Sequence, residues 1–191
     1  EFTRSVSNAW TGGSFTWTNS GGSANDFDIN GTQGTHTHTD TNVLRYSTAS
    51  VGEPNHRVRT SVDFSTTTIT GAAVSTWLLG RVTDTSNYYA ALVSIATGGN
   101  ATVGIYKRVA GVLTQIESSV SVGSIIPVGS TLEVELYCEG PKIYARAWPT
   151  RIFAGIGTIP NPDVPTAWMV STTDSSVTTG TAAVGLNPDH I

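Results

Sequence analysis

The chain has little charge, a single cysteine and no long apolar run. Charged residues make up 13% of its 191 residues, against roughly 25% in an ordinary soluble domain. The net charge is −4 and no basic stripe is visible, which argues against a nucleic-acid partner. No apolar run approaches the roughly 20 residues that span a bilayer, so we expect no membrane insertion. No signal-peptide pattern is present.

The only cysteine, Cys138, excludes a disulfide within the chain. It alternates with Val134 and Leu136, which is typical of a small buried hydrophobe. A nucleophilic cysteine needs a nearby base, and its sequence neighbours supply none. The chain begins at Glu1-Phe2 without a methionine, and we therefore expect a module of a larger protein.

Helical periodicity is also nearly absent, and alternation with a period of two takes its place. Between Arg57 and Phe64, one side of the predicted strand carries Val, Thr and Phe, and the other carries Arg57 and Arg59. About a dozen such strands at regular spacing, with Thr-rich surfaces and Gly or Pro turns, predict a two-sheet sandwich. We expect one all-β domain over residues 1–191.

The turn residues predict one hairpin in detail. Gly140-Pro141 suits a type II′ turn, because Gly accepts a positive φ and Pro fixes the next φ near −65°. That two-residue loop places Cys138 opposite Ile143, Tyr137 opposite Tyr144, and Glu135 opposite Arg146, which is chemically sensible on both faces. A similar hairpin is expected at Ala110-Gly111. The prolines between residues 149 and 165 predict mostly loop there.

These segments together resemble the central meander of a concanavalin A-like (laminin G-like) domain. The resemblance rests on Gly80–Asp84, Asn87-Tyr88-Tyr89, the hairpins at 107–111 and 132–148, Trp168, and residues 177–185. It implies a two-sheet antiparallel jelly-roll β-sandwich. The start of the chain (residues 20–27 and 34–37) resembles a variant on tail or surface proteins of actinobacterial phages. Proteins of this fold mostly bind glycans or other extracellular surfaces, and some hydrolyse glycans.

Aromatic and arginine side chains are the candidates for sugar contact, because a ring can stack on the C–H face of a sugar while polar groups fix its orientation. The alternative is that the same rings fill the core. Trp148, Arg146 and Tyr144 share one predicted strand face. The full candidate set is Trp148, Arg146, Tyr144, Tyr88, Tyr89, Arg151 and Trp168.

Glu133 and Glu135 are the candidates for glycan cleavage, since glycosidases use paired carboxylates. They lie at i and i+2 on one strand, roughly 7 Å apart, whereas a retaining pair needs about 5–5.5 Å. Hydrolases with this fold carry three carboxylates in an acid–x–Asp–x–(x)–acid pattern. This sequence lacks the third carboxylate at the expected place. Arg146 and Lys142 are also placed to pair with these acids, which does not suit a general acid. We therefore predict a charged sheet face and no catalytic residue.

Oxygen ligands suggest where a cation could bind. Asp26, Asp28 and Asn30 reproduce the first half of a calcium loop. An EF-hand is excluded because Thr37 stands where a bidentate Glu is needed. A looser Ca²⁺ site at these three residues is left open, and no cofactor is required. His36 and His38 share a strand face, but zinc needs a third or fourth ligand.

The sequence therefore predicts a non-catalytic attachment module of a virion tail or an extracellular surface protein. The expected partner is a cell-surface glycan or a neighbouring structural protein, and a homo-oligomer is left open. A glycan-cleaving hydrolase and a purely structural assembly domain are the alternatives.

Overall fold

The computed structural model describes residues 17–20, 27–30, 33–36, 45–49, 53–63, 73–96, 99–123, 131–153, 158–160 and 165–187. These residues form fourteen strands. Throughout the ranges just given, no helix is long and apolar enough to cross a membrane.

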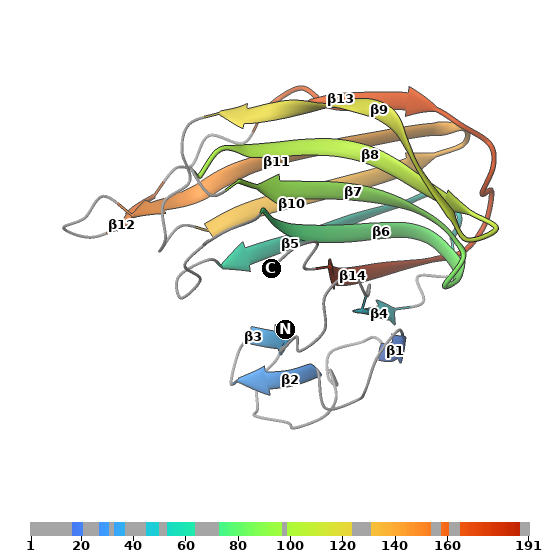
Figure 1. The fold of residues 1–191 in the computed structure, drawn as a ribbon, viewed down its shortest axis with the longest axis horizontal. Helices are drawn as coiled ribbons and strands as arrows, with labels where there is room; N and C mark the ends of the chain where they lie inside the picture. Colours follow the sequence, from blue (N-terminus) through green and yellow to red (C-terminus); the bar gives the residue numbers. More distant parts are fainter. Residues whose placement is uncertain are drawn as a thin grey trace.

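The strands are numbered in the order in which they occur along the chain (Figure 1). Their bounds are β1 Trp17–Ser20, β2 Phe27–Asn30, β3 Gln33–His36, β4 Arg45–Ala49, β5 His56–Asp63, β6 Val74–Asp84, β7 Asn87–Ile95, β8 Ala101–Val109, β9 Val112–Gly123, β10 Thr131–Glu139, β11 Lys142–Phe153, β12 Thr158–Pro160, β13 Val170–Thr173 and β14 Thr181–Asn187.

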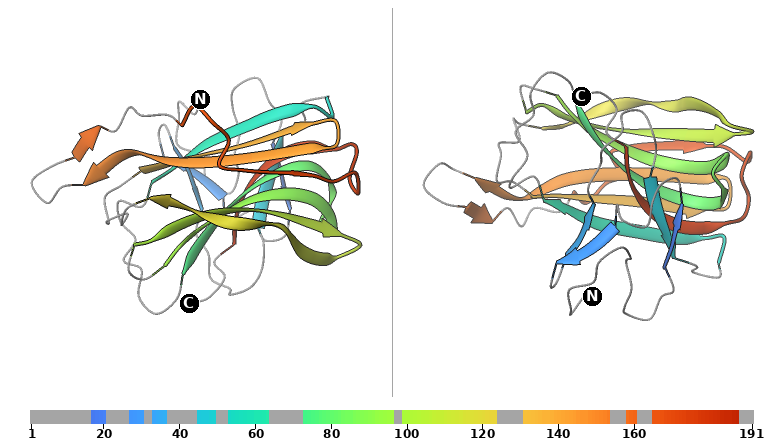
Figure 2. Two further views of the ribbon diagram at one scale, coloured as in Figure 1. Left: turned by 90° about the horizontal axis from the view of Figure 1, so that it is seen from above. Right: turned by 60° about the horizontal axis from the view of Figure 1, so that its bottom comes forward.

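Two antiparallel sheets pack face to face, which confirms the predicted jelly-roll β-sandwich (Figure 2). The larger sheet has seven strands in the order β1-β4-β14-β6-β7-β8-β9. The smaller has five, in the order β12-β11-β10-β5 with β13 paired to β11, and β2 and β3 form a separate ribbon. The early strands β1 and β4 join the last strand β14 in the larger sheet, so they pair within this chain.

The main core lies between the sheets and follows from alternation along the central strands. On β10 the residues facing inward are Leu132, Val134, Leu136 and Cys138, all 0% exposed. They meet inward side chains of β6, β7, β8 and β11, among them Leu78, Tyr89, Val93, Ile105, Ile143 and Ala145. Fully burying a side chain such as Leu or Ile stabilises a fold by about 1.5–3 kcal/mol.

Both predicted hairpins are confirmed, and they use different turns. Glu139 pairs with Lys142 across a two-residue loop, and Gly140 has φ of 53°, as a type II′ turn requires. Val109 pairs with Val112, and the loop residues Ala110 and Gly111 have φ of 48° and 83°. Two positive φ values make the second turn type I′.

The loop predicted between residues 149 and 165 is wrong in part. β11 continues to Phe153, and β12 pairs with its end. Pro149 stays in the strand because the register shifts beside it, from Leu132↔Pro149 to Thr131↔Arg151. A bulge is one of the few places where a sheet accepts a residue without an N–H.

The sequence did not predict the buried arginine near the end of β6. The β6–β7 register shifts between Gly80 and Asp84, and Arg81 there has φ of 51° and is 2% exposed. Its guanidinium donates to the carbonyls of Pro54 (2.9 Å) and Val177 (3.2 Å). These bonds tie the start of β5 and the segment before β14 to β6.

Candidate functional site

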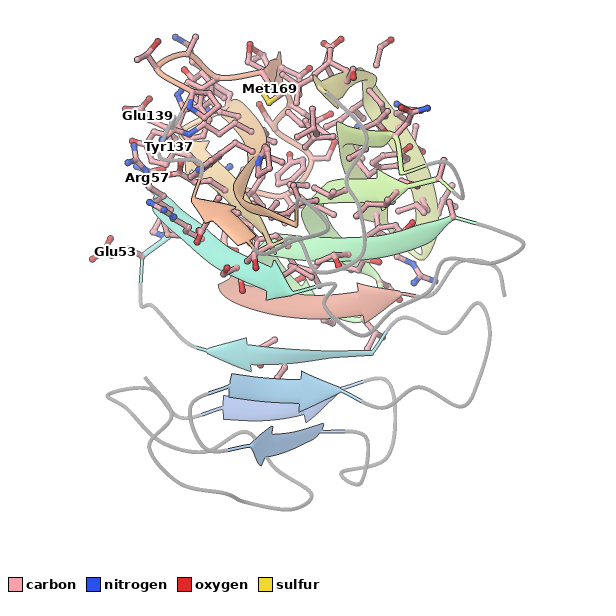
Figure 3. The ribbon with its side chains drawn as sticks, turned by 90° about the vertical axis from the view of Figure 1, so that its left-hand side faces the viewer. Glu53, Arg57, Tyr137, Glu139 and Met169 are labelled. Atoms are coloured by element: carbon pink, nitrogen blue, oxygen red, sulfur yellow. The ribbon has the colours of Figure 1, made fainter. Side chains whose placement is uncertain are left out.

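The outward face of the five-stranded sheet carries most of the predicted site residues. Period-two alternation turns every second side chain of β5, β10 and β11 away from the core. Figure 3 shows Arg57, Tyr137 and Glu139 together on this outer side. We call the following set the arginine–aromatic face: Arg57, Arg59, Glu133, Glu135, Tyr137, Tyr144, Arg146, Trp148 and Trp168.

Three half-buried rings form the centre of this face. Tyr137 and Tyr144 are cross-strand partners on β10 and β11, and their ring centroids are 5.8 Å apart in a stacked arrangement. Trp168, which precedes β13, adds a third ring at 6.0 Å from Tyr137 and 5.5 Å from Tyr144. These are distances at which aromatic pairs attract each other.

Two sets of ion pairs flank the rings. The Glu135 side chain is 2% exposed, and its carboxylate forms ion pairs with Arg57 Nε at 3.2 Å and with Arg146 Nη2 at 2.6 Å. Arg146 also donates Nε to Glu135 at 2.6 Å and Nη1 to the Pro165 carbonyl. Arg59 donates Nε to Glu133 at 2.7 Å.

The guanidinium groups also cover the ring faces. The Arg59 Cζ lies 4.9 Å from the centroid of Trp148. The Arg146 Cζ lies 4.7 Å from Trp168 and 5.3 Å from Trp148. The Arg57 Cζ lies 5.1 Å from Tyr137 and 5.5 Å from Trp168. All five are cation–π distances, so what faces solvent is a mixture of guanidinium and ring edges.

The structure brings four of the predicted contact residues together on this face: Tyr144, Arg146, Trp148 and Trp168. Trp148 is only 2% exposed, so it supports Arg59 and Arg146 from beneath and cannot itself meet a ligand in this conformation. The side chain of Arg151 lies outside the described part of the chain.

Tyr88 and Tyr89 are not part of this face, because both belong to β7 in the other sheet. Tyr88 is 1% exposed and Tyr89 is 0% exposed. The structure therefore gives neither of them a surface that a sugar could reach, and both serve packing.

Three residues of the face were missed as site candidates: Arg57, Arg59 and Tyr137. The signals were present in the sequence. Tyr137 was correctly paired with Tyr144, and the two arginines were correctly placed on the polar side of β5. What the sequence did not provide was the adjacency of β5 and β10, which sets Arg57 opposite Tyr137 and Arg59 opposite Glu135.

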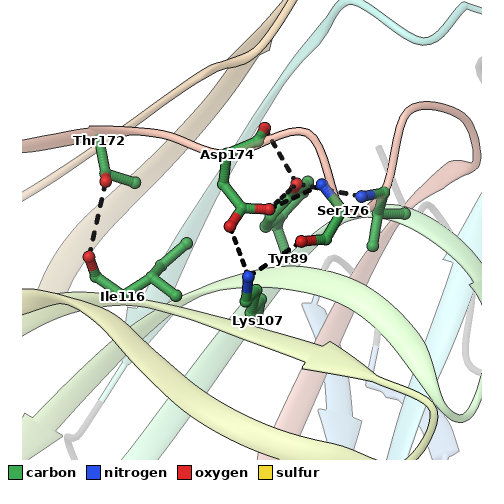
Figure 4. Close-up of polar contacts among 7 residues, drawn as sticks. Tyr89, Lys107, Ile116, Thr172, Asp174 and Ser176 are labelled. Atoms are coloured by element: carbon green, nitrogen blue, oxygen red, sulfur yellow. Dashed lines mark hydrogen bonds and ion pairs between the residues drawn. The ribbon is translucent and has the colours of Figure 1, made fainter.

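Tyr89 instead belongs to a polar network that joins the two sheets (Figure 4). Its hydroxyl donates to Asp174 Oδ1 at 2.6 Å and accepts from the Val177 N–H at 3.1 Å. Lys107 donates to Asp174 Oδ2 at 2.5 Å and to Ser176 Oγ at 2.9 Å. Burial, together with Asp174, raises the pKa of Tyr89 to about 12.

The two carboxylates considered for glycan cleavage are both held in ion pairs. Glu135 is 2% exposed between two arginines, and Glu133 is paired with Arg59. A general acid must lie within hydrogen-bond reach of the substrate oxygen, and a buried, doubly paired Glu135 does not offer that reach.

Cys138 has a potential base after all, because the β5–β10 register places His56 opposite it. The geometry does not make a nucleophile. His56 Nδ1 bonds the Glu53 carbonyl at 2.9 Å, and its Nε2 accepts from the Arg81 N–H at 3.3 Å. Burial raises the pKa of the Cys138 thiol to about 11, and burial also lowers the pKa of His56. A reactive cysteine needs the opposite shift and some exposure.

The candidate calcium ligands fall largely outside the described structure. Asp28 and Asn30 lie on β2, but their side chains are not described, and neither is Asp26. His36 ends β3, and neither its side chain nor any part of His38 is described. Among the described residues, no group of three His, Cys, Asp or Glu side chains could hold a metal ion.

Comparison with known proteins supports the fold. No protein-family model and no curated protein sequence matches this chain. Among solved structures, the carbohydrate binding module CBM66 from Bacillus subtilis is similar, with a TM-score of 0.54 and 14% sequence identity. The match covers 98% of this chain and 89% of the other. The two proteins therefore share a β-sandwich fold.

Proposed function

We propose that this protein is a non-catalytic glycan-binding module and that the arginine–aromatic face is its binding surface. The observation that carries the proposal is the cluster of Tyr137, Tyr144 and Trp168, three half-buried rings flanked by arginines on the outside of a sheet. Aromatic and arginine side chains are the residue types most enriched at binding surfaces. The likeness to a carbohydrate-binding module adds support at the level of the fold.

The ring contacts indicate how a sugar would bind. The Tyr and Trp edges provide apolar contact, while the tyrosine hydroxyls and the guanidinium groups provide hydrogen bonds that set orientation. A shallow surface of this kind gives modest affinity for each copy. Several copies on one particle would raise the overall avidity by orders of magnitude.

We also propose that the protein lies on the outside of a cell or virion, for example on a phage tail. This location rests on the resemblance of residues 20–27 and 34–37 to phage surface proteins. The partner would then be a host or neighbouring cell-surface glycan. Calcium at Asp26, Asp28 and Asn30 is a further expectation, which the test below includes, and assembly into a homo-oligomer is a separate expectation that solution mass would test.

The test is a glycan-array screen with the purified protein, run with Ca²⁺ and with chelator. Trp168→Ala is expected to abolish the wild-type signal, because it removes the ring that contacts both tyrosines. Leu113→Ala is the matched control, since Leu113 is a 45% exposed apolar side chain on the other sheet. A blank array with folded protein, or equal loss in both variants, would refute the proposal. Loss of signal with chelator would support the calcium site.

A further inference from the structure

The arginines of β5 have hydrogen-bonding groups that no residue in the described part of the chain uses. The Arg57 and Arg59 side chains are 55% and 49% exposed. Arg57 forms an ion pair through its Nε with Glu135, and Arg59 donates its Nε to Glu133. Within the described ranges, the Nη groups of both have no hydrogen-bond partner. Arg146 differs, because Nε, Nη1 and Nη2 all have protein partners.

The two free guanidinium ends are arranged as a pair. Arg57 and Arg59 stand at i and i+2 on one strand, so they share a face at a spacing of about 6.5–7 Å along the strand. β5 is the last strand of its sheet, with β10 as its one strand partner among the described elements. The Nε contacts to glutamate and the contacts to the Tyr137 and Trp148 rings fix the planes of the guanidinium groups. Fixing these planes in advance reduces the entropy lost on binding.

We propose that the arginine–aromatic face selects acidic glycans, through a carboxylate or sulfate group of the sugar bound by Arg57 and Arg59. This inference rests on the proposed glycan-binding function and adds the class of ligand. A guanidinium fork matches the two oxygens of a carboxylate or sulfate and binds them more strongly than it binds neutral hydroxyls. A neutral sugar would make weaker contacts with this face, because arginines already cover the ring faces on which it could stack.

Negative side chains limit where the acidic group can bind. Glu139 is exposed at the hairpin end beside Tyr137, and Glu53 is exposed before β5. Both lie toward the Arg57 end of the strand. The ligand's acidic group is therefore expected closer to Arg59 than to Arg57, which remains its second contact, with the uncharged part of the sugar against Tyr137, Tyr144 and Trp168.

The test uses an array of oligosaccharides in matched pairs, each acidic member (carboxylated or sulfated) printed beside its neutral counterpart. The wild-type protein is expected to bind acidic members at least tenfold better, and its binding should weaken as salt rises. Arg59→Gln should lower that affinity by about tenfold or more. Arg59→Lys should also weaken binding, because it keeps the charge and loses the fork.

Arg108→Gln provides the matched control. Arg108 lies on β8 in the other sheet and donates Nε to the Gly111 carbonyl at 3.0 Å, so this change removes the same charge away from the face. Preference for neutral members, or equal loss in Arg59→Gln and Arg108→Gln, would overturn the acidic-glycan inference alone. A blank array would overturn the proposed function and this inference together. Thermal unfolding of each variant confirms that the protein tested is folded.

Discussion

The outward faces of the two sheets carry similar large side chains but bury them to different degrees. On the seven-stranded sheet, Trp77 and Tyr88 are each 1% exposed and pack with Leu79, Ala90 and Leu92 in a second apolar cluster. On the five-stranded sheet, Tyr137, Tyr144 and Trp168 are half-buried among arginines and glutamates. One face is closed and apolar, and the other is open to solvent and charged.

This contrast suggests that one face stabilises the fold and the other is available for recognition. Burial of a large apolar side chain contributes to folding in proportion to the area removed from water. Charged groups that are exposed to solvent contribute little to folding, because water and salt screen them. Large aromatic side chains therefore have a structural role on the first face, whereas on the second they remain available to a partner.

The largest expected effect comes from the closed face. Trp77→Ala should lower the free energy of unfolding by about 3–5 kcal/mol, since it removes a large buried side chain and leaves a cavity. Urea unfolding measures the change. Trp77→Phe should cost much less, because the indole N–H is buried and has no hydrogen-bond partner within the described structure.

The comparison between the faces also predicts that Trp77→Ala leaves glycan affinity unchanged in the protein that still folds, whereas Trp168→Ala removes affinity. If the folded Trp77→Ala protein lost binding as Trp168→Ala does, the division between a structural face and a recognition face would be untenable.

The second effect distinguishes two glutamates on one strand. Glu135→Gln should lower the free energy of unfolding by about 3 kcal/mol, because it leaves two arginines without their buried counter-ion. Glu133→Gln is the matched control and should cost about 0–1 kcal/mol, since its partner Arg59 is 49% exposed. Both values come from urea unfolding at neutral pH. Equal losses would contradict the view that burial, and not the ion pair as such, sets the cost.

Sequence reasoning predicted the elements that depend on local rules. The Gly140-Pro141 turn fixed the β10–β11 register, because only one alignment is chemically sensible on both faces. The same alternation correctly assigned inward and outward residues on β5. The number and spacing of the strands predicted the two-sheet sandwich, and the resemblance to the concanavalin A-like fold implied the same arrangement.

The rest depends on contacts between segments far apart in the sequence. Trp148 alternates like an exposed residue, and it is buried because Arg59 and Arg146 lie over it. Trp168 joins the face from a loop whose position no periodicity encodes. The Arg81 bulge needs Gly180, whose added Cβ would lie 2.3 Å from the Arg81 carbonyl carbon. The prediction of a single domain over residues 1–191 remains a prediction.

The network between the sheets gives a third prediction, which depends on pH. Although burial alone would raise it, the pKa of Asp174 is held well below its usual value of 3.8 by hydrogen bonds from Lys107, Tyr89 and Ser176. Above pH 3.8 the carboxylate is ionised in the folded and the unfolded chain, so the network contributes in full. As the pH falls below that value, the unfolded chain takes up a proton that the folded chain does not, and stability is lost.

Asp174→Asn should therefore lower the free energy of unfolding by about 1–2 kcal/mol at neutral pH. The variant should also lose less stability than the wild type when the pH is lowered from about 5 to about 2, because one linked proton is gone. Urea unfolding across that range measures both slopes. Tyr89→Phe keeps the carboxylate and its Lys107 pair, so its slope should lie between the two. Parallel slopes for all three proteins would mean that the acid sensitivity arises elsewhere than at Asp174.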